Sequence, residues 1–168
     1  MNKNSNENGE IITISLIFVG IIVAIGMFVL AIFMSHINTI LYNLKIDMYS
    51  LNKSAVISVN KYKTSIDDFS YNSKVYKNEF INGLKANYDL NDELENKDKL
   101  INKIEVIEYT IYEANKKDSY TKKRVDDRVI HTVLKVRITP IILKSFLEDI
   151  FVFTIHEDVV LNSMKTSL

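Results

Sequence analysis

The sequence predicts an α+β fold: one long helix, transmembrane and then amphipathic, packed on a small three-stranded antiparallel β-sheet, with a second short helix. Three observations predict it. Residues 11–34 contain no charged side chain, residues 35–63 have apolar side chains at helical spacing, and beyond residue 100 the apolar pattern alternates with a period of two. An amphipathic helix needs an apolar partner, and a half-buried sheet provides one.

A short polar N-terminal tail, residues 1–10, precedes the uncharged segment Ile11–Met34. This segment is longer than the roughly 20 residues that cross the hydrocarbon core of a bilayer. A secretory signal peptide, the alternative, has a basic start, a shorter apolar stretch and a small-residue cleavage site, which this segment matches poorly. We therefore expect a single-pass protein of the cell membrane, with membrane lipid around residues 11–34.

The direction of insertion is only weakly encoded. Lys3 lies on the amino-terminal side of the span, whereas Lys45 and Lys53 lie within about twenty residues of its other end. This count leans slightly toward a cytoplasmic carboxyl-terminal domain, but it rests on a difference of one lysine. The charges therefore leave the orientation open.

The helix is expected to continue beyond the membrane as an amphipathic extension over residues 35–63. No Gly or Pro interrupts this segment, and its apolar side chains recur in steps of three and four, which is the spacing of a single helical stripe. The stripe consists of Ile37, Leu41, Leu44, Met48, Leu51, Ala55 and Val59. Lys45, Asp47 and Asn52 fall between these positions, on the side that we expect to be polar.

The rest of the chain, residues 64–168, is expected to form a small α+β extramembrane domain. A second helix is predicted from Ser73, which suits an N-cap, to Tyr88, because aromatic and leucine side chains repeat there every four residues. The stretch Asn91–Asp98 is polar and is predicted to be a connector.

Strands are predicted where the period changes to two. They cover Ile104–Ile111, with a bulge, then Val129–Ile138 and Phe151–Leu161. Between the first two strands, Glu113–Lys123 is predicted to be an exposed hairpin loop. After Pro140, which ends the second strand, Ile141–Asp149 is predicted to form a short helical or coiled excursion.

Composition excludes several classes of function. Basic and acidic residues number 21 each, so the chain has no net positive field to attract nucleic acid. With no cysteine, it has neither disulfides nor thiolate metal sites. No nucleophile elbow, P-loop or His-Glu-x-x-His pattern is present. We therefore predict no enzyme activity, no catalytic residues and no cofactor.

Two histidines are weighed as possible metal ligands. His131 and His156 could be cross-strand neighbours, with Glu157 and Asp158 close by. However, His156 and Asp158 point to one face of their strand while Glu157 points to the other, and a metal needs several ligands that converge on one point. The sequence therefore favours surface histidines on a solvated sheet face, and no metal site is predicted.

Small side chains recur at helical spacing within the span, at Gly20, Ala24, Ala31 and Ser35. Small residues on one face allow two helices in a membrane to approach closely, as in small-x-x-x-small motifs. The alternative is that Gly and Ala are simply ordinary components of a span. Helix association through these four residues is one hypothesis for the span.

The order of the elements resembles that of type IV pilin-like proteins and, more narrowly, of the TadE-like minor pilins of tight-adherence (Tad/Flp) pilus systems. Two stretches carry the likeness, NENGEIITISLIFVGII and VLKVRITPIILKSFLEDIFVFTIHEDVVLNSM. In the first, Glu10 directly precedes the apolar run. In the second, a strand, a proline-led excursion and a final strand follow one another as in that family.

The resemblance implies specific roles for the N-terminal residues. Such proteins are typically cut by a prepilin peptidase five positions before a Glu, which pairs with the new amino terminus of a neighbouring subunit. Here the Glu would be Glu10 and cleavage would follow Ser5, where the family has Gly. Gly9 is the Gly present, and cleavage after it would place Ile14 at the position of the Glu. The family also implies an extracytoplasmic domain.

Two functions follow as hypotheses. The first is a pilin-like accessory subunit for assembly of a surface pilus or secretion filament, acting through helix–helix and protein–protein association with other pilin or envelope proteins. The alternative is a single-pass envelope scaffold or regulatory protein whose extramembrane domain binds another protein. The first predicts proteolytic processing of the N-terminus and the second does not.

Overall fold

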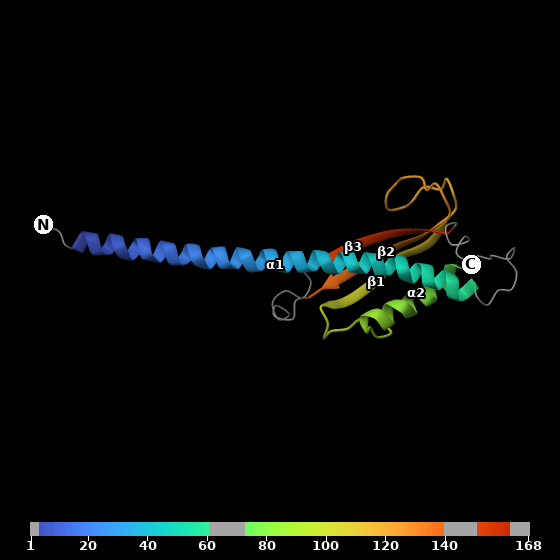
Figure 1. Ribbon diagram of the computed structural model, residues 1–168, viewed down its shortest axis with the longest axis horizontal. Helices are drawn as coiled ribbons and strands as arrows, with labels where there is room; N and C mark the ends of the chain where they lie inside the picture. Colours follow the sequence, from blue (N-terminus) through green and yellow to red (C-terminus); the bar gives the residue numbers. More distant parts are fainter. Residues whose placement is uncertain (1–3, 61–72, 140–150, 162–168) are drawn as a thin grey trace. The chain divides into compact units, whose positions relative to one another are not determined.

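The computed structural model describes residues 4–60, 73–139 and 151–161 (Figure 1). It confirms the predicted α+β class, with two helices and a three-stranded antiparallel sheet. The chain divides into two compact units, Met1–Ile40 and Leu41–Leu168. The five elements are α1 (Asn4–Asn60), α2 (Ser73–Tyr88), β1 (Ile101–Tyr112), β2 (Val129–Ile138) and β3 (Val152–Val160).

The first unit consists of the amino-terminal part of α1. This helix is long and apolar enough to cross a membrane, and none of its most apolar window is buried. The core helix of a soluble protein would instead be mostly buried. α1 begins at Asn4, earlier than the predicted start at Ile11. Polar residues without proline can extend a helix that a long apolar segment has already nucleated.

The second unit contains the sheet, in which β2 lies between β1 and β3 and pairs antiparallel with both. Central position explains why β2 is the most buried strand. The register aligns Tyr109, Thr132 and Glu157 across the three strands. Because side chains alternate along a strand, these three residues define one face of the sheet, and their sequence neighbours define the other.

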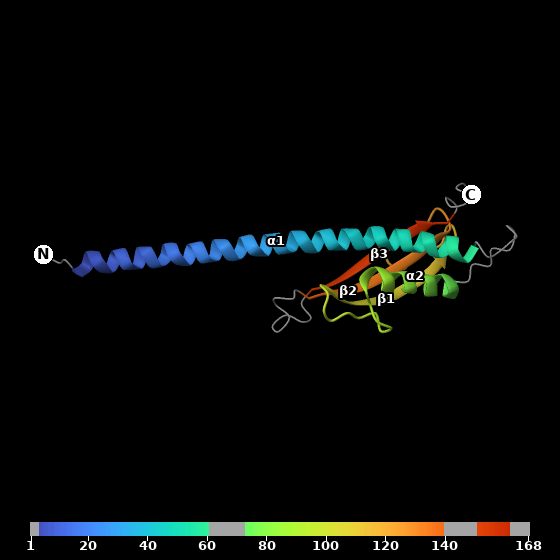
Figure 2. The same ribbon diagram turned by 60° about the horizontal axis from the view of Figure 1, so that its bottom comes forward.

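Both helices of the second unit pack on the face that Tyr109, Thr132 and Glu157 define (Figure 2). The Phe80 ring of α2 lies 5.4 Å from the Tyr109 ring, centroid to centroid. From α1, the Asn52 amide donates a hydrogen bond to the Thr132 hydroxyl at 3.1 Å. The predicted packing of the amphipathic segment on the sheet is therefore confirmed for the part of α1 that follows Leu41.

The residues of the predicted apolar stripe are buried or half-buried. Leu44, Met48 and Ala55 are buried in the second unit, Leu41, Leu51 and Val59 are half-buried, and Ile37 of the first unit is also buried. Asn52 corrects the prediction. It was assigned to the polar side, yet it is fully buried because its amide pairs with Thr132 on the sheet. A polar side chain tolerates such a position when it is hydrogen-bonded.

β1 contains the predicted bulge. Val106 pairs with Leu134 and Glu108 with Val133, so Ile107 is the extra residue. A bulge shifts the alternation of the residues that follow it. As a result Ile104 and Val106 before the bulge, and Tyr109 after it, all face the helices, whereas Glu108 points to the opposite face.

α2 has the predicted bounds, Ser73–Tyr88, and it buries Tyr76, Phe80 and Leu84. Gly83 lowers its helix propensity but allows close packing. A Cβ at Gly83 would overlap Cδ2 of Leu51 in α1. The second unit therefore brings α2 and α1 together at a point where only a glycine fits without rearrangement of Leu51. The predicted excursion Ile141–Asp149 lies outside the described residues.

A half-buried carboxyl on the helix-facing side of β3 makes stability depend on pH. Burial raises the pKa of Glu157, although the Lys45 ammonium at 3.4 Å pulls it down. A raised carboxyl pKa favours the neutral form in the fold, so the contribution is complete below the ordinary value of 4.5 and is lost as pH rises through the raised value. We expect Glu157→Gln to raise the unfolding midpoint near pH 8 and to leave it unchanged near pH 4.

The partner variant Lys45→Gln provides the opposite sign. It removes the charge that lowers the pKa of Glu157, so the domain should unfold more readily near pH 8 than the wild type. Thermal unfolding followed by near-ultraviolet circular dichroism at both pH values measures the two effects. Parallel shifts of both variants in the same direction would contradict this account.

Candidate functional site

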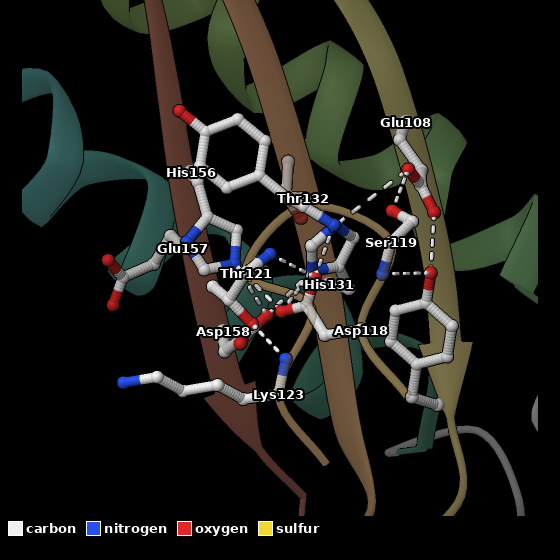
Figure 3. A network of polar contacts seen from close by, with 12 residues as sticks. Glu108, Asp118, Ser119, Thr121, Lys123, His131, Thr132, His156, Glu157 and Asp158 are labelled. Carbon is white, nitrogen blue, oxygen red and sulfur yellow. Dashed lines mark hydrogen bonds and ion pairs between the residues drawn. The ribbon is translucent and has the colours of Figure 1, made fainter. Parts of the chain in front are cut away.

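The sheet face opposite the helices holds a cluster of two histidines and two aspartates, which we call the His–Asp cluster (Figure 3). Its members are Asp118, His131, His156 and Asp158. Each offers one nitrogen or oxygen atom, and these four atoms lie within 4.8 Å of one another. His131 comes from β2, His156 and Asp158 come from β3, and Asp118 comes from the loop between β1 and β2.

Antiparallel pairing places the three strand residues together. His131 is the direct partner of Asp158, and His156 lies diagonally across from His131 because it pairs with Val133. The imidazole Nδ1 of His131 lies 2.8 Å from Oδ1 of Asp158, and the two imidazole rings are 4.8 Å apart. The pairing of β2 with β3 is therefore sufficient to bring these three side chains together.

Asp118 reaches the cluster because its loop folds onto the sheet. The Oδ1 atom of Asp118 accepts hydrogen bonds from the backbone N–H groups of Tyr120 and Thr121, at 2.6 and 2.9 Å. Its Oδ2 atom lies 3.5 Å from Nδ1 of His131 and 3.4 Å from Nε2 of His156. The Asp118 side chain is 1% exposed, yet Oδ2 makes no hydrogen bond.

A second layer of side chains surrounds His131. Oε2 of Glu108 lies 3.8 Å from Nε2 of His131, the ring nitrogen that faces away from the aspartates. The hydroxyls of Tyr112 and Ser119 donate hydrogen bonds to the two oxygens of Glu108, at 2.8 and 2.5 Å. Glu108 occupies this place only because the bulge at Ile107 turns it to this face.

Aromatic rings hold the two imidazoles in place. The Tyr120 ring stacks on His156 with centroids 4.9 Å apart and an interplanar angle of 20°. The Tyr112 ring lies 5.1 Å from the His131 ring. Both imidazoles are thus fixed in orientation by packing as well as by polar contacts.

Two carboxyls of the site are held as carboxylates. Burial tends to raise the pKa of Asp118, but hydrogen bonds from Thr121 and Tyr120 more than offset it, so the pKa lies below the ordinary value. Burial also opposes ionisation of Glu108, and hydrogen bonds from Ser119 and Tyr112 again bring its pKa below the ordinary value. Both groups are therefore negatively charged near neutral pH.

The prediction that the two histidines lie on a solvated sheet face is wrong. His131 is fully buried, and the His156 side chain is 17% exposed, because the loop after β1 covers this face. The predicted separation of Glu157 from His156 and Asp158 is confirmed, since Glu157 contacts Lys45 on the other face. What sequence analysis missed is Asp118, within a loop that was predicted to be exposed. An Asp that can accept hydrogen bonds from the backbone N–H groups of the next residues indicates a turn, but it does not indicate that the loop covers the sheet.

The residues predicted for processing and for helix association lie in the first unit. Ser5, Gly9 and Glu10 belong to the first turns of α1. Gly20, Ala24, Ala31 and Ser35 are exposed, and helical geometry places them on one side of α1. A Cβ added at Gly20 would have no atom within 4 Å. This side is free to meet lipid or another helix.

Fold and site together define a class: a protein with one exposed apolar helix of membrane-spanning length and an α+β domain that carries a buried His–Asp cluster. Comparison with models of protein families, with curated proteins and with solved structures finds no match to this chain.

Proposed function

We propose that this protein is a membrane-anchored, pilin-like accessory subunit that assembles with other subunits of a surface pilus or secretion filament through its long helix. The observation that supports the proposal is α1 itself. One helix supplies an exposed apolar segment to the first unit and part of the buried core of the second. With the resemblance to TadE-like proteins, this arrangement favours an extracytoplasmic domain displayed on a membrane helix.

The exposed apolar segment requires a partner. Large apolar side chains such as Ile22, Phe28 and Val29 are more than half exposed, and a surface of this kind is covered by lipid or by other helices. Within a bilayer, lipid tails are as apolar as the helix, so association depends on close packing at small residues. The small-residue side at Gly20, Ala24, Ala31 and Ser35 is the part of α1 best suited to it.

Cysteine cross-linking tests this association in the full chain, which has no natural cysteine. We expect Ala24→Cys and Ala31→Cys, on the small-residue side, to form disulfide-linked dimers when membranes from the native cells are oxidised. The matched controls Ile22→Cys and Val29→Cys lie on the opposite side of the same helix and should cross-link much less. Absence of cross-links at Ala24 and Ala31, or equal cross-linking on both sides, would contradict helix association through this face.

The intact mass of the protein from its native membranes separates the pilin-like function from the alternative of an envelope scaffold. Loss of the residues up to Ser5, or up to Gly9, is expected for a subunit processed by a prepilin peptidase. A mass that retains Asn2 and all residues after it would favour the scaffold, whose partner would bind the second unit instead.

A further inference from the structure

We propose that the His–Asp cluster binds one Zn²⁺ ion, which joins the loop between β1 and β2 to strands β2 and β3. This inference is independent of the proposed assembly function, because it concerns only the second unit. Four features of the cluster support a bound ion: its charge, its geometry, its outer layer and the chemistry of its donor atoms.

The charge of the cluster is the first feature. Asp118 and Asp158 place two carboxylates in one cluster, and within the described residues neither pairs with a lysine or an arginine. The buried Oδ2 atom of Asp118 makes no hydrogen bond, although the loop satisfies Oδ1 twice. A buried carboxylate oxygen without a partner is costly. A divalent cation at the centre of the cluster neutralises both carboxylates and gives this oxygen its partner.

The geometry of the cluster is the second feature. Four nitrogen–oxygen separations in the cluster are 2.8, 3.1, 3.4 and 3.5 Å. A tetrahedral site with metal–ligand bonds of about 2.0–2.1 Å needs ligand atoms about 3.3 Å apart. Four of the six edges of the cluster are therefore close to those of a zinc tetrahedron, and the other two are no longer than 4.8 Å. Small adjustments of Asp158, which is 27% exposed, suffice to open its shortest edge.

The outer layer of the cluster is the third feature. A histidine that binds a metal through one ring nitrogen usually donates the N–H of the other to a carboxylate. In His131, Nδ1 faces the aspartates, and Nε2 lies 3.8 Å from the Glu108 carboxylate without a hydrogen bond; two hydroxyls hold Glu108 in place. Asp118 is likewise oriented by two backbone N–H groups. Second-layer groups of this kind fix the ligands before the metal arrives.

The chemistry of the donor atoms is the fourth feature, and it selects the ion. Two imidazole nitrogens and two carboxylate oxygens suit Zn²⁺ and similar transition metals, whereas Ca²⁺ and Mg²⁺ prefer sites made of oxygen alone. Four protein ligands fill a tetrahedral zinc ion completely, as in structural sites, whereas catalytic sites keep one position open. We therefore assign the ion a structural role, in which it stabilises the loop and the face of the sheet beneath it.

The test uses the full chain, purified in detergent and stripped with a chelator. Isothermal titration with Zn²⁺ should give one ion per chain, and Zn²⁺ should raise the unfolding midpoint because the unfolded chain lacks the preformed site. Co²⁺ should give the intense visible bands of tetrahedral coordination, and added Zn²⁺ should abolish them. Ca²⁺ or Mg²⁺ at the same concentration should do neither.

Variants locate the ion. His156→Ala and Asp158→Asn remove partly exposed ligands and should weaken Zn²⁺ affinity more than Glu108→Gln does. Glu108→Gln, in the outer layer, should weaken it by about 10–100-fold and keep one site. The matched controls are His36→Ala, in α1, and Asp126→Asn, on the exposed part of the same loop; both should bind as the wild type does. Resistance to trypsin in chelator verifies that each variant is folded.

Two results would overturn the proposal. The first is wild-type protein that binds no Zn²⁺. The second is Zn²⁺ binding that His156→Ala and Asp158→Asn leave unchanged, which would place the ion elsewhere on the chain. Because the wild-type titration decides the first, a variant that fails to fold does not remove the test.

Discussion

Replacing Phe80 by alanine is expected to lower the free energy of unfolding of the second unit by about 3–5 kcal/mol. Phe80 is fully buried, and its ring lies 5.4 Å from that of Tyr109 on β1. Truncation removes a buried aromatic contact between α2 and the sheet and leaves a cavity. Because a domain of this size is stable by only about 5–15 kcal/mol, the loss is a large part of the total.

The measurement must report on the second unit alone, since the apolar part of α1 stays helical in detergent. The chain has nine tyrosines and no tryptophan, so near-ultraviolet circular dichroism of tyrosine during urea unfolding is suitable. Ile107→Ala is the control, because Ile107 is 58% exposed on the same sheet and should change stability by less than about 0.5 kcal/mol. Equal effects of the two substitutions would show that α2 does not pack as described.

Three arginines at the centre of the apolar segment are expected to abolish membrane insertion. Each of Ile21→Arg, Val23→Arg and Ile25→Arg replaces a favourable residue by one that costs about 2.5–3.5 kcal/mol at the centre of a span. The sixteen Leu, Ile, Phe and Val residues of Ile11–Met34 contribute about 7 kcal/mol on the same scale, so three arginines cancel the driving force.

Extraction of membranes with alkaline carbonate measures the result. The wild type should stay in the membrane pellet and the triple arginine variant should not, while a triple leucine variant at the same positions should behave as the wild type. Resistance of residues 73–139 to trypsin verifies that the second unit still folds. Retention of the triple arginine variant in the pellet would show that another part of the chain holds the protein to the membrane.

The fold was predictable because its signals are local. A four-residue repeat predicts a helix such as α2, and a period of two predicts a strand. Neither pattern depends on the neighbouring elements. The bulge in β1 was also visible, because Val106 and Ile107 are adjacent apolar residues in an otherwise alternating run. The span and the stripe after it followed from charge and spacing in the same way.

The site was only partly predictable, because it depends on contacts between distant residues. The pairing of His131 with Asp158 could be anticipated from two antiparallel strands, but the burial of His131 depends on the loop that carries Asp118. No local pattern shows that a polar loop folds back onto a sheet. The same holds for Asn52, whose pairing with Thr132 spans 80 residues of sequence.

The extra residue in β1 has a consequence for how this domain can change. Ile107 itself is exposed and contacts little, so many side chains are acceptable there. Its exclusion from the ladder as a bulge lets Tyr109 face the core and Glu108 face the side of the sheet that holds the cluster, because an unbulged strand that included Ile107 would exchange these two residues. Loss of this one codon would leave both assignments in place, since Val106, Glu108 and Tyr109 would then alternate regularly against the same partners. Natural selection should therefore tolerate both a change of identity at residue 107 and its deletion.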